Sequence, residues 1–82
     1  MAVRDMVSIA DAERAQQTLR KRFGRMPGVQ AIGVTWDEKG DAHVRVNVDS
    51  SLHQEISAVI PSELDGVPVE LRRVKGMRTF GR

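Results

Sequence analysis

Basic side chains gather at the C-terminal end of this 82-residue chain, and these are the residues best suited to contact a charged partner. The five positions are Arg72, Arg73, Lys75, Arg78 and Arg82. Residues 1–71 carry every Asp and Glu of the chain, so the positive charge lies at one end. Arg45 joins the set because strand alternation predicts that it shares a sheet face with Arg72. The cluster indicates contact with a nucleic-acid backbone or an acidic partner, and an idle, solvated tail is the alternative.

The other reactive side chains do not form a catalytic or metal-binding pattern. The chain has no cysteine, which excludes a disulfide framework, a thiolate zinc site and a thiol nucleophile. His43 and His53 lie beside no serine-and-acid constellation, and nothing nominates a third metal ligand for them. Three carboxylates lie close together at Asp37, Glu38 and Asp41, but they lack the spacing of a calcium loop. We therefore expect no enzyme activity, no cofactor and no metal.

A hairpin at residues 29–48 is the element around which the domain is organised. Apolar residues alternate along both predicted strands, so six of them are expected on one face: Ile32, Val34, Trp36, Val44, Val46 and Val48. His43, Arg45 and Asn47 are expected on the opposite face, together with the small residues of the first strand. Gly33 marks a place where another backbone can come close, so the interface of a sheet-mediated homodimer is expected to include it.

A helix is predicted before the hairpin, over residues 9–23. Ser8 and Asp11 have the spacing of a capping box, and apolar residues recur from Ile9 to Phe23 at steps of three and four. Gly24 is expected as a left-handed cap, and Pro27 prevents continuation of the helix. Basic residues at the end of this helix offset the negative end of the helix dipole, and nucleic-acid contact is the alternative role for them. These residues are Arg20, Lys21, Arg22 and Arg25.

After the hairpin, the pattern predicts a second helix and a third strand. A short helix that faces the sheet is predicted to run to Val59 or Ile60. Asp49, Ser50 and Ser51 offer a choice of caps for it, and Ser51 with Gln54 forms a capping-box pair. Residues 61–64 are expected to add one helical turn, and Asp65-Gly66 is a turn signal. The third strand is predicted over residues 67–73 and a short fourth strand over residues 77–80.

These elements predict one α+β domain over residues 1–82, frayed at residues 1–7 and 81–82. The order is α-β-β-α-β(-β), with a three- to four-stranded, mostly antiparallel sheet and two helices on one face. Charged residues near the N-terminus, such as Arg4 and Asp5, interrupt any apolar run that would form a signal peptide or a membrane span. We expect no membrane contact and a cytoplasmic location.

Residues 29–80 resemble a small α/β module that precedes the catalytic domain in some bacterial trypsin-like serine peptidases and that also occurs as free-standing small proteins of unknown function. Its most specific part is Ile60-Pro61 followed by the run at residues 64–69, LDGVPV. The other matching positions are Val29, Ile32-Gly33-Val34, Gly40, Val46, Val48 and Gly76. The resemblance implies a compact sheet with helices on one face. It implies no proteolysis, because the family's catalytic residues lie in a separate domain that these residues do not include.

Two functions follow from these observations. The first is a non-catalytic protein-interaction or accessory module that binds another protein or a second copy of itself. The second is nucleic-acid binding through the open sheet face and the basic C-terminal segment. Two features of the chain argue against nucleic-acid binding. It has no Gly-x-x-Gly loop of the kind found in a KH domain, and it has no aromatic side chain for stacking as in an RRM, because Trp36 is expected in the core.

Overall fold

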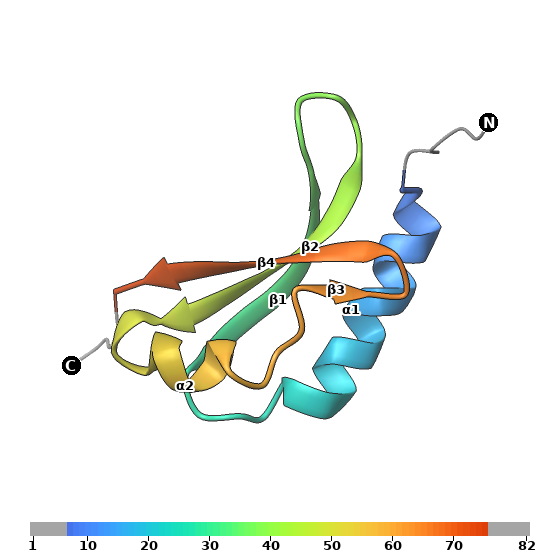
Figure 1. The fold of residues 1–82 in the computed structure, drawn as a ribbon. Helices are drawn as coiled ribbons and strands as arrows, with labels where there is room; N and C mark the ends of the chain where they lie inside the picture. The colour runs from blue at the N-terminus through green and yellow to red at the C-terminus, as the bar shows by residue number, and fades with distance from the viewer. Residues whose placement is uncertain (1–6, 76–82) are drawn as a thin grey trace.

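The computed structural model describes residues 7–75, which fold into two α-helices, a 3₁₀ turn and four strands (Figure 1). In chain order they are α1 (Ile9–Phe23), β1 (Val29–Trp36), β2 (Ala42–Asp49), η1 (Ser50–Leu52), α2 (His53–Ser57), β3 (Glu63–Leu64) and β4 (Val67–Val74). This order confirms the predicted α+β architecture. The predicted strand at residues 77–80 lies outside the described residues.

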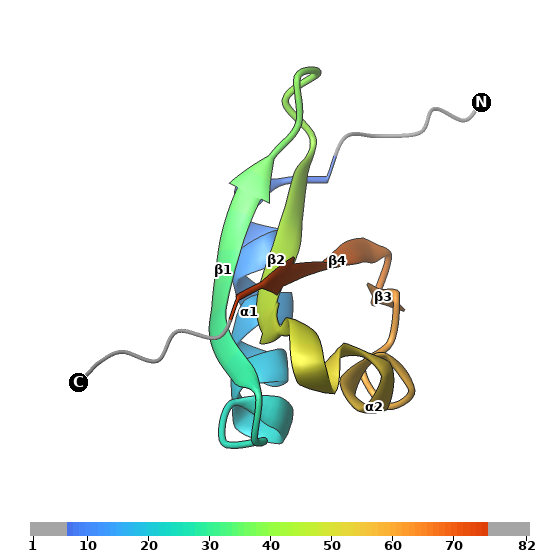
Figure 2. The same ribbon diagram turned by 90° about the vertical axis from the view of Figure 1, so that its left-hand side faces the viewer.

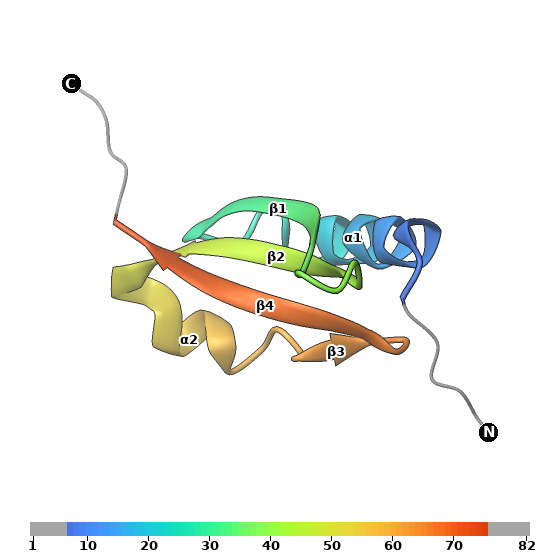
Figure 3. The same ribbon diagram turned by 90° about the horizontal axis from the view of Figure 1, so that it is seen from above.

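The four strands form one mixed sheet in the order β1-β2-β4-β3. β2 is antiparallel to β1 and parallel to β4, while the two-residue β3 is antiparallel to β4. The parallel pair requires a crossover, which η1, α2 and β3 supply between β2 and β4 (Figures 1 and 3). The strand predicted over residues 67–73 is therefore paired with β2 in the parallel direction.

Helix α1 begins as predicted and ends as predicted, but its C-terminal cap differs. The Ser8 hydroxyl accepts a hydrogen bond from the Asp11 N–H at 3.1 Å. Gly24 is right-handed, with φ −62°, so the expected left-handed cap at this residue is wrong. The left-handed residue is Gly28, with φ +92°, where a Cβ would also lie 2.7 Å from Leu52 Cδ1. The chain thus reverses next to β1, where α2 leaves no room for a side chain.

The hairpin places its alternating residues on the predicted faces over most of its length. Ile32 pairs with Val46 and Val34 pairs with Val44, while Gly33 pairs with Arg45 on the other face. The connecting turn is held by the Asp37 carboxylate, which accepts hydrogen bonds from the N–H groups of Lys39 and Asp41. Trp36 departs from the expectation, because it is 57% exposed rather than buried.

The crossover departs from the predicted helix in three ways. Asp49, one of the predicted caps, accepts a hydrogen bond from the Ser51 N–H at 2.9 Å, whereas the Ser51–Gln54 pair does not form the capping box. α2 ends at Ser57, and Val59 is exposed. Residues 63–64 are extended because they pair with the start of β4 through a tight turn at Asp65 (φ 52°) and Gly66 (φ 83°).

Both helices bury their apolar residues against the same face of the sheet. Leu19 of α1 and Ile56 of α2 are fully buried with the β2 valines, and Figure 2 shows α1 behind β1 and β2. The complete buried core of the described residues is Ala12, Ala15, Leu19, Ile32, Ala42, Val44, Val46, Val48, Ile56, Ile60, Val67 and Val69. Val34 and Leu71, expected in this core, are only half-buried. In the described part of the chain, neither helix is long and apolar enough to cross a membrane.

Candidate interaction surface on the open sheet face

The sheet face opposite the helices carries polar and small side chains, and we call it the open face. Its positions are Ala31, Gly33, Thr35, His43, Arg45, Asn47, Glu70 and Arg72, which share one face by strand alternation and register. None of the described helices covers these residues, and all of them are exposed or half-buried. A Cβ placed on Gly33 would meet no atom within 4 Å, so the space above β1 is open.

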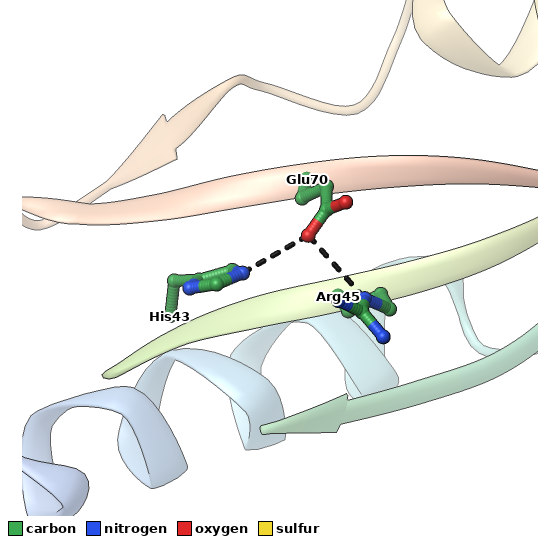
Figure 4. Close-up of polar contacts among 3 residues, drawn as sticks. All are labelled: His43, Arg45 and Glu70. Carbon is green, nitrogen blue, oxygen red and sulfur yellow. Dashed lines mark hydrogen bonds and ion pairs between the residues drawn. The ribbon is translucent and has the colours of Figure 1, made fainter. Parts of the chain in front are cut away.

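The centre of the open face is an ordered group of three charged or ionisable side chains (Figure 4). Glu70 Oε1 lies 3.0 Å from His43 Nε2 and accepts a hydrogen bond from Arg45 Nε at 3.3 Å. Arg45 and Glu70 are direct neighbours across the parallel β2–β4 pair, and His43 lies two residues earlier on the same face. The crossover therefore brings together residues that are 25 and 27 positions apart.

These contacts favour the ionised form of Glu70. The hydrogen bond from His43 is the main cause that lowers the pKa of the Glu70 carboxyl below its ordinary value, and Arg45 adds to the effect. Partial desolvation acts in the opposite direction. Because Glu70 carries a negative charge at neutral pH, it holds the Arg45 guanidinium, and the contact is made by Nε rather than by a terminal nitrogen.

A shallow hollow of about 390 Å³ lies at the hairpin end of the open face. Its lining combines an aromatic side chain with charges of both signs: Trp36, Asp37, Glu38, Lys39, His43 and Arg45. The turn contributes Asp37, Glu38 and Lys39, while β2 contributes the other two polar residues. Trp36 is the only tryptophan of the chain and is more than half exposed, so an aromatic surface borders this hollow.

The described members of the predicted basic cluster lie on both sides of β4 or directly after it. Arg72 lies on the open face next to Asn47, but Arg73 pairs with Val48 and so points to the opposite side of the sheet. Lys75 is exposed directly after β4. Arg78 and Arg82 lie outside the described residues. Of the predicted contact residues, Arg45 and Arg72 are brought to the same face, and Arg45 is already engaged by Glu70.

The two histidines have separate surroundings. His43 lies on β2 with Glu70, whereas His53 begins α2. Among residues 7–75, no group of three or more histidines and carboxylates is arranged to hold a metal ion. Asp37 and Asp41 instead serve the hairpin: Asp37 closes the turn, and Asp41 Oδ1 accepts from the Val7 N–H at 3.2 Å.

Glu70 and Trp36 are the site residues that sequence reasoning missed. Alternation placed Glu70 on the correct face, but no feature of residues 67–74 indicated that this strand lies beside β2. Trp36 continues the alternating apolar pattern of its strand, so the pattern alone placed it in the core. The signal against burial is its position directly before the charged turn at residues 37–41, where α1 no longer covers the hairpin.

Comparison of the chain with known protein families, curated proteins and solved structures finds no match. The resemblance to the module of trypsin-like serine peptidases therefore stays a prediction.

Proposed function

We propose that this protein is a small non-catalytic interaction or accessory module, and that its open face binds another protein. The observation that carries the proposal is the hollow at the hairpin end, which both the exposed Trp36 and the ordered Arg45 line. Tryptophan and arginine are the residues most enriched among those that dominate binding energy at protein interfaces. A cytoplasmic location is part of the same proposal.

The charge distribution of the hollow favours a protein over a polyanion as its occupant. Lys39 and Arg45 are cationic there, but Asp37 and Glu38 border the same space. A surface with both signs suits a partner that also carries both signs, and it gives specificity through the pairing of opposite charges. We infer a partner that places an apolar or aromatic group against Trp36 and a carboxylate on the terminal nitrogens of Arg45.

Glu70 serves this role as a positioning residue. By accepting from Arg45 Nε, it limits the rotamers of the guanidinium before a partner arrives, which lowers the entropy lost on binding. His43 holds the same carboxylate oxygen from the other side.

Site-specific photo-crosslinking in cells that naturally contain the protein tests the proposal. A photoreactive residue replaces Thr35 on the open face, and the matched control replaces Gln17, which is exposed on α1. We expect Thr35 to yield an adduct with one defined protein and Gln17 to yield none. The adduct should disappear when Trp36→Ala and Arg45→Glu are introduced together. Equal labelling from both positions would contradict a role for the open face.

Nucleic-acid binding is the second candidate, and the exposure of Trp36 favours it. A buried Trp36 could not stack on a nucleic-acid base, but the expectation that Trp36 is buried is wrong. Arg45 and Arg72 also share the open face. Against this candidate, Asp37 and Glu38 border the aromatic side chain, and acidic groups repel phosphates.

Fluorescence of Trp36 distinguishes the two candidates directly. Single-stranded RNA and duplex DNA are titrated into the full chain at about 0.15 M salt, where the Debye length is near 8 Å. We expect no submicromolar binding. Tight binding with a log–log salt slope of about −3.5 to −4.5, as five phosphate contacts give, would rank nucleic acid first. Removal of Arg78 and Arg82 would then flatten that slope by nearly two.

A further inference from the structure

The outer edge of β1 is a long strand edge without the usual protection against pairing. β1 is terminal in the sheet order, and none of the described strands pairs with its outer side (Figures 2 and 3). Its eight residues, VQAIGVTW, include no charged residue and no proline. β4, on the other side of the sheet, carries Pro68, Glu70, Arg72 and Arg73 and is covered at its start by β3. Edges that lack charges and proline favour pairing with another strand.

The hydrogen-bonding groups that β1 offers can be identified from the hairpin register. Asp37 N–H donates to Asp41 O, so alternation makes Thr35 and Gly33 the residues that bond to β2. The groups of Ile32, Val34 and Trp36 therefore face outward. Gln16 of α1 donates to Ile32 O at 2.9 Å, which agrees with this assignment. The backbone groups of Val34 and Trp36 have no such cover among the described residues.

The charges at the two ends of β1 are opposite. At its start, the last turn of α1 and the following loop carry the exposed cations Arg20, Lys21, Arg22 and Arg25. At its end, the hairpin turn carries Asp37, Glu38 and Asp41 with one cation, Lys39, so its net charge is negative. When two such strands pair in the antiparallel direction, the start of one lies beside the end of the other. A second copy would therefore place each cationic end beside an acidic end, twice in one dimer.

We propose that two copies of this chain pair through their β1 edges, antiparallel and around a two-fold axis at Gly33 or Val34. The product is one continuous sheet with all helices on one side and the two open faces joined on the other. This inference rests on the proposed function, because it names a second copy of the chain as one partner of the interaction module. It uses the strand edge rather than the centre of the open face, and the two surfaces share Trp36.

The same register brings a protruding side chain to a hollow. With the axis at Gly33 or Val34, Trp36 of one copy lies opposite residue 30 or 32 of the other. A hollow of about 160 Å³ is found at that place, lined by Arg20, Gly24, Val29, Gln30, Ala31 and Ile32. In that hollow the Arg20 guanidinium can make a cation–π contact with the indole of the other copy's Trp36. This fit between Trp36 and the opposite end of the edge is independent of the charge argument.

The test measures the mass of the full chain by sedimentation equilibrium from about 1 μM to 1 mM, a range that brackets micromolar dimers. Val34→Pro removes an outward N–H, and Val34→Ala is its control because it keeps that N–H. We expect wild type and Val34→Ala to form dimers and Val34→Pro to be monomeric. Circular dichroism establishes that each variant is folded.

Charge reversal provides a second test that does not alter the strand. Arg25→Glu and Glu38→Lys are each expected to weaken the dimer about tenfold, because each turns two attractions into repulsions. Combined in one chain, they restore opposite charges and should bring the dissociation constant back to within about threefold of wild type. Both positions are exposed, so neither change affects the core.

A wild-type chain that is monomeric throughout this range would overturn the proposal, as would a dimer that Val34→Pro and both single charge reversals leave intact. Either result leaves the crosslinking test at Thr35 unaffected, because that test detects an adduct with a different protein. Conversely, a β1-edge dimer without any crosslinked partner would support this inference and contradict the proposed binding by the open face.

Discussion

The two faces of β2 have opposite tasks although their residues alternate along one strand. Val44, Val46 and Val48 are fully buried under the two helices. His43 and Arg45, which alternate with them along the strand, are partly exposed and contact Glu70 across the open face. The first face provides burial and the second provides directed polar groups. Substitutions on the helix face should therefore change stability, whereas those on the open face should change recognition.

The two faces should differ most in how much a substitution lowers the free energy of unfolding, and neighbouring positions of β2 allow this comparison. Val46→Ala leaves a cavity between the sheet and the helices and should lower the free energy of unfolding by roughly 2–4 kcal/mol. Arg45→Ala removes a partly exposed ion pair and should lower it by less than about 1 kcal/mol. Urea denaturation measures both values. Equal losses would mean that the two faces are not distinct in stability.

Two glycines provide the next comparison. Gly28→Ala introduces a Cβ at φ +92° and within 2.8 Å of both Leu52 and Ile56 methyl groups, so we expect a loss of roughly 1–3 kcal/mol. Gly33→Ala adds a Cβ into open space on a strand. Gly33→Ala should raise the free energy of unfolding by up to about 1 kcal/mol, because glycine is unfavourable inside strands. Thermal unfolding of the two variants measures the contrast.

The Glu70 contacts predict a small, pH-dependent contribution. The folded-state pKa of Glu70 is lowered, so its stabilisation is present above the unfolded-state pKa near 4.5 and is lost as the pH falls through the folded-state pKa. Glu70→Gln should cost a few tenths of a kcal/mol at neutral pH, as is typical of exposed pairs, and nothing in strong acid. Glu63→Gln on β3 is the control. A difference that grows toward low pH would contradict the assigned direction.

Trp36 should have the smallest effect on stability and a clear spectroscopic signature. Because the side chain is 57% exposed, Trp36→Ala should change the free energy of unfolding by less than about 0.5 kcal/mol. In the wild-type protein, a neutral quencher should reach the indole almost as well as in the unfolded chain. Strong protection from the quencher in a monomeric sample would mean that Trp36 belongs to the core after all.

Local sequence patterns predict the parts of this protein that depend on neighbouring residues. The bounds of α1 and β1, the faces of the hairpin and the assignment of Arg45 to the open face all follow from caps and alternation, which act over a few residues. Alternation is decisive in β2 because a shift by one residue would exchange Val46 for Arg45 in the core.

Contacts between distant segments set which strands lie side by side and how far α1 covers the hairpin. The pattern of residues 67–74 fits parallel and antiparallel pairing equally well, yet the parallel pairing with β2 is what brings Glu70 to His43 and Arg45. Trp36 follows the same alternation as Ile32, but α1 does not extend over the hairpin end, so one is exposed and the other is buried. Burial is a property of what lies above a residue, and the contacts that set it come from segments distant in the chain.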